Sequence, residues 1–239
     1  MKIPDPVTPY LQGAEFSGGL VVRFEMAPED RHYRSRIDLL VEISQGKNVI
    51  HLGCVDHDPD TVKKKLRHEK WLHAHLCNSA THCFGVDINA EGIRFLQEMG
   101  YADTSCLDIL ETDDTRLTAR SWDLLLVPEV LEHIGNPVDF LSRIHKKYRN
   151  IDRLVVTVPN AFTKSNFRNA GRGAEVINSD HRYWFTPYTI AKVVSQAGFR
   201  VERLLMCRSG IIKKRSLIKN LYYSAFPLIR SNIILVAAW

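Results

Sequence analysis

Short apolar runs alternate with segments of helical periodicity along residues 31–238, and this alternation constrains the fold more than any other feature. Seven runs have the length of β-strands, and several are apolar throughout, which is typical of parallel strands covered on both faces. The strand-like runs are 48–53, 83–88, 104–109, 122–127, 153–158, 201–206 and 233–238. The helical segments are 31–45, 60–77, 90–99, 137–148 and 187–197, with Asn89, Asn136 and Thr186 placed as N-caps of the last three.

Strands that alternate with helices predict right-handed crossovers and a parallel sheet. The sequence therefore predicts an α/β fold, a doubly wound, seven-stranded, mostly parallel sheet of the Rossmann-like type. A chain of 239 residues fits one domain of this kind. We expect an N-terminal arm over residues 1–30, which are rich in Pro and Gly and have no sustained period, and a single domain over residues 31–239.

The segment 211–230 separates the last two strand-like runs and mixes basic residues with large apolar ones. One interpretation is a short helix that covers the end of the sheet. The other is a basic amphipathic helix that rests on a membrane or on an acidic partner.

The formal net charge of +5 is mild and is concentrated late in the chain. It favours an acidic partner or surface without requiring nucleic acid, and we expect no DNA partner. No run approaches the ~18 apolar residues of a membrane span, and the first ten residues lack the apolar region of a signal peptide. We expect a cytoplasmic protein, with peripheral contact at the inner face of the membrane as an alternative. The oligomeric state stays open.

The cysteine and histidine spacing gives no metal motif. The five cysteines have no CxxC pairing, and four of them fall within apolar strand or helix patterns, so we expect neither a disulfide framework nor a zinc site. His68, His73 and His75 fall in the charged helical segment 60–77 and are expected on a solvated face.

Polar or flexible residues follow the first three strand-like runs. Gly53 ends the first run and permits a tight turn with close approach to a ligand. Asp87 ends the second, where it could accept the hydroxyls of a ribose, and Asp108 ends the third, where an exocyclic amine could donate to it. Ligands of doubly wound sheets bind beyond the carboxyl ends of the strands, so these residues predict a shared pocket.

In these motifs the chain resembles class I S-adenosylmethionine-dependent methyltransferases. The resemblance implies that the cofactor is S-adenosylmethionine, that Asp87 binds its ribose, Asp108 its adenine amine, and the backbone at Gly53 and Cys54 its methionine part. The neighbouring positions assigned to the same pocket are Val55, Ile88, Ile109 and Pro128.

The first glycine loop departs from the family pattern. That family usually has Asp at the position of His51 and further glycines at Val55 and His57. A bulky loop is expected to reshape the cofactor pocket, with Asp56 or His57 taking over polar contacts. A non-catalytic scaffold of the same fold is an alternative, because fold does not fix function.

After the fourth strand-like run, Glu129, Glu132 and His133 lie at i, i+3 and i+4 and share one face if the stretch is helical. The motif resembles that of small-RNA 2′-O-methyltransferases, in which E-x-x-E-H and a later Asp-His supply metal ligands. The resemblance implies that Glu129, Glu132, His133 and His181 hold Mg²⁺, Mn²⁺ or Fe²⁺, which would activate an acceptor hydroxyl. Alternatives are catalysis by His133 or His181 as general base, with Glu132 in the catalytic group, or a purely structural role.

The basic residues Lys164, Arg168, Arg172 and Arg182 favour an anionic or strongly hydroxylated acceptor. The combined motifs are similar to those of bacterial methyltransferases associated with surface-glycan assembly. The implied reaction is O-methylation of a sugar hydroxyl in a polysaccharide, a lipid-linked glycan or a nucleotide sugar. Quinone precursors, small phenols and RNA are alternative acceptors.

Overall fold

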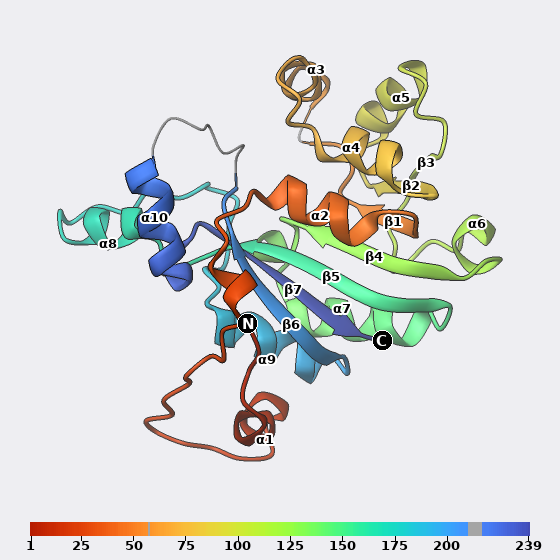
Figure 1. The fold of residues 1–239 in the computed structure, drawn as a ribbon. Helices are drawn as coiled ribbons and strands as arrows, with labels where there is room; N and C mark the ends of the chain where they lie inside the picture. Colours follow the sequence, from red (N-terminus) through yellow and green to blue (C-terminus); the bar gives the residue numbers. More distant parts are fainter. Residues whose placement is uncertain (57, 210–216) are drawn as a thin grey trace.

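The computed structural model describes residues 1–56, 58–209 and 217–239, and these residues form a seven-stranded sheet with helices on both faces (Figure 1). The strands are β1 (Asn48–Leu52), β2 (His82–Asp87), β3 (Thr104–Cys106), β4 (Trp122–Pro128), β5 (Ile151–Pro159), β6 (Arg200–Cys207) and β7 (Asn232–Ala238). Their order is β3-β2-β1-β4-β5-β7-β6, in which β7 alone runs antiparallel to both of its neighbours. The predicted α/β fold with a mostly parallel sheet is confirmed.

The helices cover two faces of the sheet (Figure 1). They are α1 (Thr8–Gln12), α2 (Arg36–Ser44), α3 (Pro59–Arg67), α4 (Leu72–Ser79), α5 (Ala90–Glu98), α6 (Thr115–Thr118), α7 (Pro137–Lys147), α8 (Lys164–Ala170), α9 (Pro187–Gln196) and α10 (Leu217–Ala225). Short 3₁₀ turns occur at Asp5–Val7, Pro28–Arg31, Leu131–His133 and Pro227–Ile229. The N-caps Asn89, Asn136 and Thr186 are confirmed, since each side chain accepts a backbone N–H three residues later.

Alternate residues along the strands divide the core between these faces, as the two-residue period of a strand requires. Val49 and Leu124 pack with α2 and α4, whereas Ile50 and Leu125 belong to the larger core that includes apolar residues of α7 and α9. Because both faces of the central strands are buried, the sheet is held rigidly and its carboxyl ends can position side chains accurately.

The helix expected over 60–77 is wrong as a single element, because the chain breaks between α3 and α4. Glu69 has a φ of 54°, and the N–H of Lys70 donates to the carbonyl of Lys65 at 2.8 Å, which closes the end of α3. The restart turns one face of α4 toward the sheet. His73 is consequently only 1% exposed, which contradicts its expected place on a solvated face.

Parts of residues 1–30 are packed onto the domain, with Met1, Val7 and Leu11 buried in the larger core. Lys2 forms an isolated β-bridge with Glu25, and α1 contacts α9. The N-terminal segment therefore contributes to the same core as the sheet.

Part of the predicted insert 211–230 lies outside the described residues, namely 211–216. The described part holds α10, on which Leu217 and Ile218 are 82% and 86% exposed. Beyond it, the buried guanidinium of Arg230 donates to the carbonyls of Asp30, Arg31, Met206 and Tyr223. Within the described ranges, no helix is long and apolar enough to cross a membrane.

Candidate functional site

A cavity of about 650 Å³ opens beyond the carboxyl ends of β1, β2 and β4. We call it the strand-end cavity. Of the residues assigned to the site from the sequence, its lining includes Gly53, Cys54, Val55, Asp87, Ile88, Pro128, Glu129, Glu132, His133 and His181. The structure thus brings together ten of the twelve predicted positions from four separate stretches of the chain.

The loop after β1 is shaped by Gly53, whose φ is 75°. Its N–H donates to the carbonyl of Val86 at 2.8 Å, and a Cβ atom at this position would lie 3.0 Å from Cγ2 of Val130. Glycine is therefore required both by the backbone conformation and by the close contact. The next residue, Cys54, is buried, and its carbonyl accepts a hydrogen bond from Nε1 of Trp71 at 3.3 Å.

Asp87, at the end of β2, holds this loop in place. Its Oδ2 accepts from the N–H of Val55 at 2.9 Å, and its Oδ1 accepts from the N–H of Asn89 at 3.0 Å. Burial raises the pKa of Asp87, while the N–H donors of Asn89 and Val55 act in the opposite direction. Each carboxylate oxygen can accept a second hydrogen bond, so Asp87 can hold the loop and still accept from two hydroxyl groups.

The bulky loop residue Val55 is accommodated by a glycine elsewhere. A Cβ atom on Gly92, in the first turn of α5, would overlap with the side chain of Val55. Asp56 also lines the cavity, but its carboxylate pairs with Lys65. His57 lies outside the described residues.

Asp108 lies after β3, outside the lining of the strand-end cavity. Strand β3 ends at Cys106, and the exposed Asp108 accepts from the N–H of Leu110 at 2.8 Å, which caps the following turn. Ile109 is buried in the core. Among the described residues, the lining of the strand-end cavity includes neither Asp108 nor Ile109.

Three of the four predicted metal-ligating residues come together. We call Glu132, His133 and His181 the acid–imidazole group, because one potential ligand atom of each lies within 4.8 Å of the others. The rings of His133 and His181 meet edge to face, with centroids 4.7 Å apart. A hydrogen bond of 2.7 Å joins Nδ1 of His133 to Oδ2 of Asp180.

Glu132 is fully buried, and neither of its carboxylate oxygens has a hydrogen-bond partner in the described part of the chain. Burial, followed by the charge of Glu129, raises the pKa of Glu132 to about 8. Burying a carboxyl group without a hydrogen-bond partner has a free-energy cost. A ligand that contacts Glu132 in this cavity would reduce that cost.

Glu129 departs from the predicted set. Its φ is 55°, and the 3₁₀ turn begins only at Leu131, so Glu129 does not share the helical face that the i, i+3, i+4 spacing predicts. Thr157 donates to its carboxylate at 2.8 Å, Asn232 donates at 3.0 Å, and Arg36 lies 3.6 Å away. Glu129 therefore lines the cavity with a carboxylate that is already hydrogen-bonded and paired with a cation.

Sequence reasoning missed several other wall residues. Arg36 comes from α2, Asn89 is the N-cap of α5, and Asn178 and Asp180 precede His181 in its loop. The capping pattern and the Asp-His pair were visible signals for Asn89 and Asp180. Arg36 carried no signal, because only the packing of α2 against β5 brings its Nη1 to 3.3 Å from Oγ1 of Thr157.

The four basic residues predicted near the acceptor do not lie together: two line a second cavity and two are exposed. Lys164 and Arg168 line a second cavity of about 330 Å³ together with Arg208 and Lys219, which we call the basic cavity. Arg182 is exposed, and its N–H donates to the carbonyl of Glu132 at 2.8 Å. Arg172 is also exposed.

The order of the strands, the glycine loop after β1 and the acidic end of β2 together define an S-adenosylmethionine-dependent methyltransferase of class I. A family described as a methyltransferase domain matches residues 27–204, and the chain belongs to this family. No curated protein sequence matches it significantly.

Solved structures with a similar fold have low sequence identity to the chain. Magnesium protoporphyrin IX methyltransferase from Synechocystis PCC 6803, with bound S-adenosylhomocysteine, has a TM-score of 0.54 and 15% identity over 88% of this chain and 83% of that one. The small RNA methyltransferase HEN1 has a TM-score of 0.57 and 16% identity over 93% of this chain, but only 27% of its own. The methyltransferase domain of bacterial CtHen1 has a TM-score of 0.53 and 19% identity over 86% and 98%. These likenesses concern the fold.

Proposed function

We propose that the protein transfers a methyl group from S-adenosylmethionine to a hydroxyl group of a sugar, in a surface glycan or its lipid-linked or nucleotide-linked precursor. One observation carries this proposal. The acid–imidazole group lines the same cavity as the glycine loop and Asp87. Groups suited to removing a proton therefore stand beside groups suited to an adenosyl ligand.

The cavity fits the cofactor on three grounds. Its volume of about 650 Å³ is that of a small-molecule site, Gly53 leaves room for close approach, and Asp87 retains acceptor capacity for ribose hydroxyls. When bound, S-adenosylmethionine supplies an electrophilic methyl group. The residues of the chain would bind the adenosyl part and aim the acceptor oxygen at that methyl group.

Removal of the hydroxyl proton is assigned to His133 or His181. The carboxylate of Asp180 can only accept, so its hydrogen bond to Nδ1 of His133 places the proton on that nitrogen and makes Nε2 the basic one. Nε2 of His133 can then accept the proton of the acceptor hydroxyl. In this scheme Asp180 is a positioning residue that selects the tautomer.

A divalent ion is the alternative mechanism, in which the imidazole nitrogens would be ligands and not proton acceptors. The unpartnered buried carboxylate of Glu132 and the imidazoles of His133 and His181 are a donor set that suits Mg²⁺, Mn²⁺ or Fe²⁺. An ion there would lower the pKa of an acceptor hydroxyl. Glu129 is left out of this ligand set, because its three hydrogen-bonding and charged partners hold it elsewhere.

Charge and exposure support an anionic, lipid-linked acceptor. The basic cavity holds Lys164, Arg168 and Arg208, and cations of this kind bind phosphate. Lys164 of α8 also stacks over Tyr222 of the neighbouring helix α10 (Figure 1). Helix α10 exposes Leu217 and Ile218. A basic cavity beside exposed apolar side chains suits a phosphate headgroup at a membrane face.

RNA is the second candidate acceptor. The observation in its favour is that Glu132, His133 and His181, which match the small-RNA methyltransferase pattern, converge on one another. A quinone precursor or a small phenol would use the same proton acceptors without needing the basic cavity.

The test is transfer of a labelled methyl group from S-adenosylmethionine to three acceptor pools. These are lipid-linked glycan extracts, nucleotide sugars and short single-stranded RNA. We expect label in a glycan fraction, released by glycosidase or mild acid and resistant to ribonuclease. Label confined to RNA would replace the sugar proposal, and cofactor binding without transfer to any pool would contradict it and leave a quinone, a phenol or the scaffold.

A further inference from the structure

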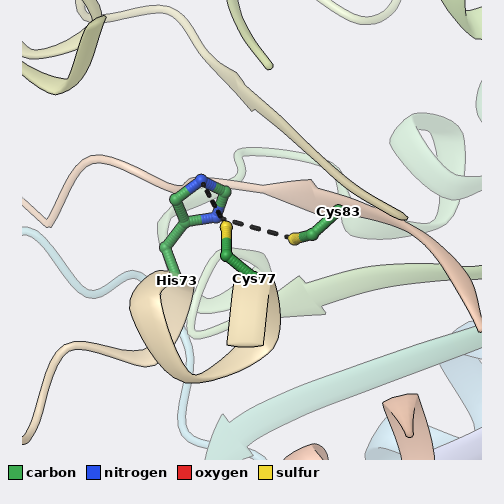
Figure 2. A group of neighbouring side chains, drawn as sticks. All are labelled: His73, Cys77 and Cys83. Atoms are coloured by element: carbon green, nitrogen blue, oxygen red, sulfur yellow. Dashed lines mark hydrogen bonds between the residues drawn. The ribbon is translucent and has the colours of Figure 1, made fainter. Parts of the chain in front are cut away.

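Three side chains with soft or borderline metal-ligating atoms meet behind the strand-end cavity. His73 and Cys77 lie one helical turn apart on α4, and Cys83 lies on the adjacent strand β2 (Figure 2). One potential ligand atom of each is within 4.8 Å of the others. Sγ of Cys77 is 3.6 Å from Nε2 of His73, and Sγ of Cys83 is 3.8 Å from Nδ1 of His73.

A fourth donor comes from β1. Nδ1 of His51 lies 3.0 Å from Nδ1 of His73, and both imidazoles are buried. A neutral imidazole can act as a metal ligand. His51 occupies the position where related methyltransferases are expected to have Asp.

The backbone leaves room for this group. A Cβ atom on Gly85 of β2 would lie 2.9 Å from Cε1 of His73 and 2.9 Å from Sγ of Cys54. Any larger residue at position 85 would displace the imidazole. The glycine therefore allows His73 to reach the sheet, where Cys83 and His51 are.

The charge state of the group also favours a cation. Both cysteines would bind the ion as thiolates, because the thiolate is the form that ligates a metal. A thiolate at these buried or half-buried positions has a desolvation cost, and a bound cation would offset it. Thiolate and imidazole together are the donor set of tetrahedral zinc sites.

We propose that His73, Cys77 and Cys83 form a structural site for Zn²⁺ or a similar thiophilic ion, with His51 as the nearest candidate for the fourth ligand. Bond lengths of ~2.0 Å to nitrogen and ~2.3 Å to sulfur give tetrahedral edges of about 3.3 Å between nitrogens and about 3.5 Å between nitrogen and sulfur. Each ring nitrogen of His73 lies near such an edge from one sulfur, 3.6 Å for Nε2 and Cys77 and 3.8 Å for Nδ1 and Cys83, and the ring would bind the ion through one of them. Binding would release the two thiol protons to solvent.

The site would join β1, β2 and α4 directly beneath the glycine loop. His51 belongs both to this proposed site and to the wall of the strand-end cavity. Its role would be to stabilise the fold at the point where the cofactor loop begins. This inference is independent of the acceptor and of the proposed ion at Glu132.

The test begins with the zinc content of the full chain, purified under reducing conditions without a polyhistidine tag from zinc-supplemented cells. We expect about one equivalent of zinc, retained in Cys106→Ser and lost in the double variant Cys77→Ser with Cys83→Ser. Cys106 is the matched control because it is exposed and lies outside the group. Circular dichroism reports whether each variant is folded.

Cobalt substitution separates this site from the acid–imidazole group. Co²⁺ added to the metal-free wild-type chain should give a thiolate-to-cobalt charge-transfer band, since only the Cys–His group contains sulfur. The band should persist in Glu132→Gln. This measurement needs no folded cysteine variant.

Three results would overturn the proposal. They are a zinc-free wild-type chain with no thiolate-to-cobalt band, a band that survives in the folded double variant, and a disulfide between Cys77 and Cys83 detected by mass spectrometry in the native chain. His51→Gln should weaken zinc binding roughly tenfold to a hundredfold, and unchanged affinity would overturn the assignment of His51.

Discussion

The side chain of Val55 occupies the space that a Cβ atom on Gly92 would need. This contact joins the glycine loop after β1 to the first turn of α5, and the N–H of Val55 also donates to Asp87. A loop with a bulky residue where the family usually has glycine is therefore matched by a glycine on the helix that faces it. The loop and α5 act as one unit at the cavity wall.

Gly92→Ala should displace Val55 and loosen cofactor binding. Overpacking of this kind costs about 1–3 kcal/mol in the free energy of unfolding. The double variant Gly92→Ala with Val55→Ala should recover most of that loss, because the added methyl group then has room. Denaturant unfolding of the two single variants and the double variant measures the coupling. Purely additive effects would show that the two residues do not share this space.

Asp87→Asn should weaken the binding of S-adenosylhomocysteine. The variant keeps an acceptor oxygen but loses the charge, so ribose hydroxyls lose charge-assisted hydrogen bonds worth about 1.5–3 kcal/mol, or roughly tenfold to a hundredfold in affinity. Isothermal titration calorimetry checks this. Asp108→Asn is the matched control and should bind nearly as tightly as wild type, because Asp108 does not line the cavity. Equal losses in both variants would contradict the placement of the two carboxylates.

Glu132→Gln should remove most of the turnover while sparing cofactor affinity. The substitution preserves shape but removes the charge that the acid–imidazole group offers to a cation or a proton. Loss of proton-transfer catalysis alone lowers rates by roughly a hundredfold to ten-thousandfold. The methyl-transfer assay, run with and without a chelator, measures it. A fully active Glu132→Gln variant in chelator-treated buffer would exclude Glu132 from catalysis and from metal binding.

The same carboxyl group predicts a pH dependence of stability in the metal-free protein. The folded state raises the pKa of Glu132 from 4.5 to about 8, so the folded protein keeps a proton that the unfolded chain releases as the pH rises above 4.5. The free energy of unfolding should therefore fall between these two pH values. At ~1.4 kcal/mol per pKa unit, the loss reaches roughly 3–5 kcal/mol.

The free energy of unfolding of Glu132→Gln should stay constant between these two pH values, because the glutamine side chain has no proton to release. Urea unfolding of the metal-free wild type and variant at intervals of pH gives the difference. Parallel curves for the two proteins would show that Glu132 ionises as an exposed carboxyl group does.

The sequence predicted the elements whose signals are local. Continuous apolar runs identified the strands, and Asn89, Asn136 and Thr186 marked helix starts because capping depends on a few neighbouring residues. The break at Glu69 was missed, since a positive φ at a residue other than glycine has no local sequence signal. Elements with regular periodicity can thus be predicted from the sequence, whereas turns that depend on packing cannot.

The candidate site shows the same limit. Gly53 and Asp87 were predictable because parallel strands bring their carboxyl ends to one edge. The position of Glu129 apart from the acid–imidazole group had no sequence signal, as its partners Asn232 and Arg36 are distant in the chain. His73 was misjudged for a similar reason, because its burial depends on His51 and on Gly85, which lie on two separate strands.

The most direct test of the account is a crystal structure of the chain grown with saturating S-adenosylhomocysteine. The account predicts the ribose hydroxyls within hydrogen-bonding distance of the Asp87 carboxylate, the homocysteine part along the backbone at Gly53 and Cys54, and the sulfur facing Glu132, His133 and His181. A ligand bound elsewhere, or an empty strand-end cavity at saturating ligand, would contradict it.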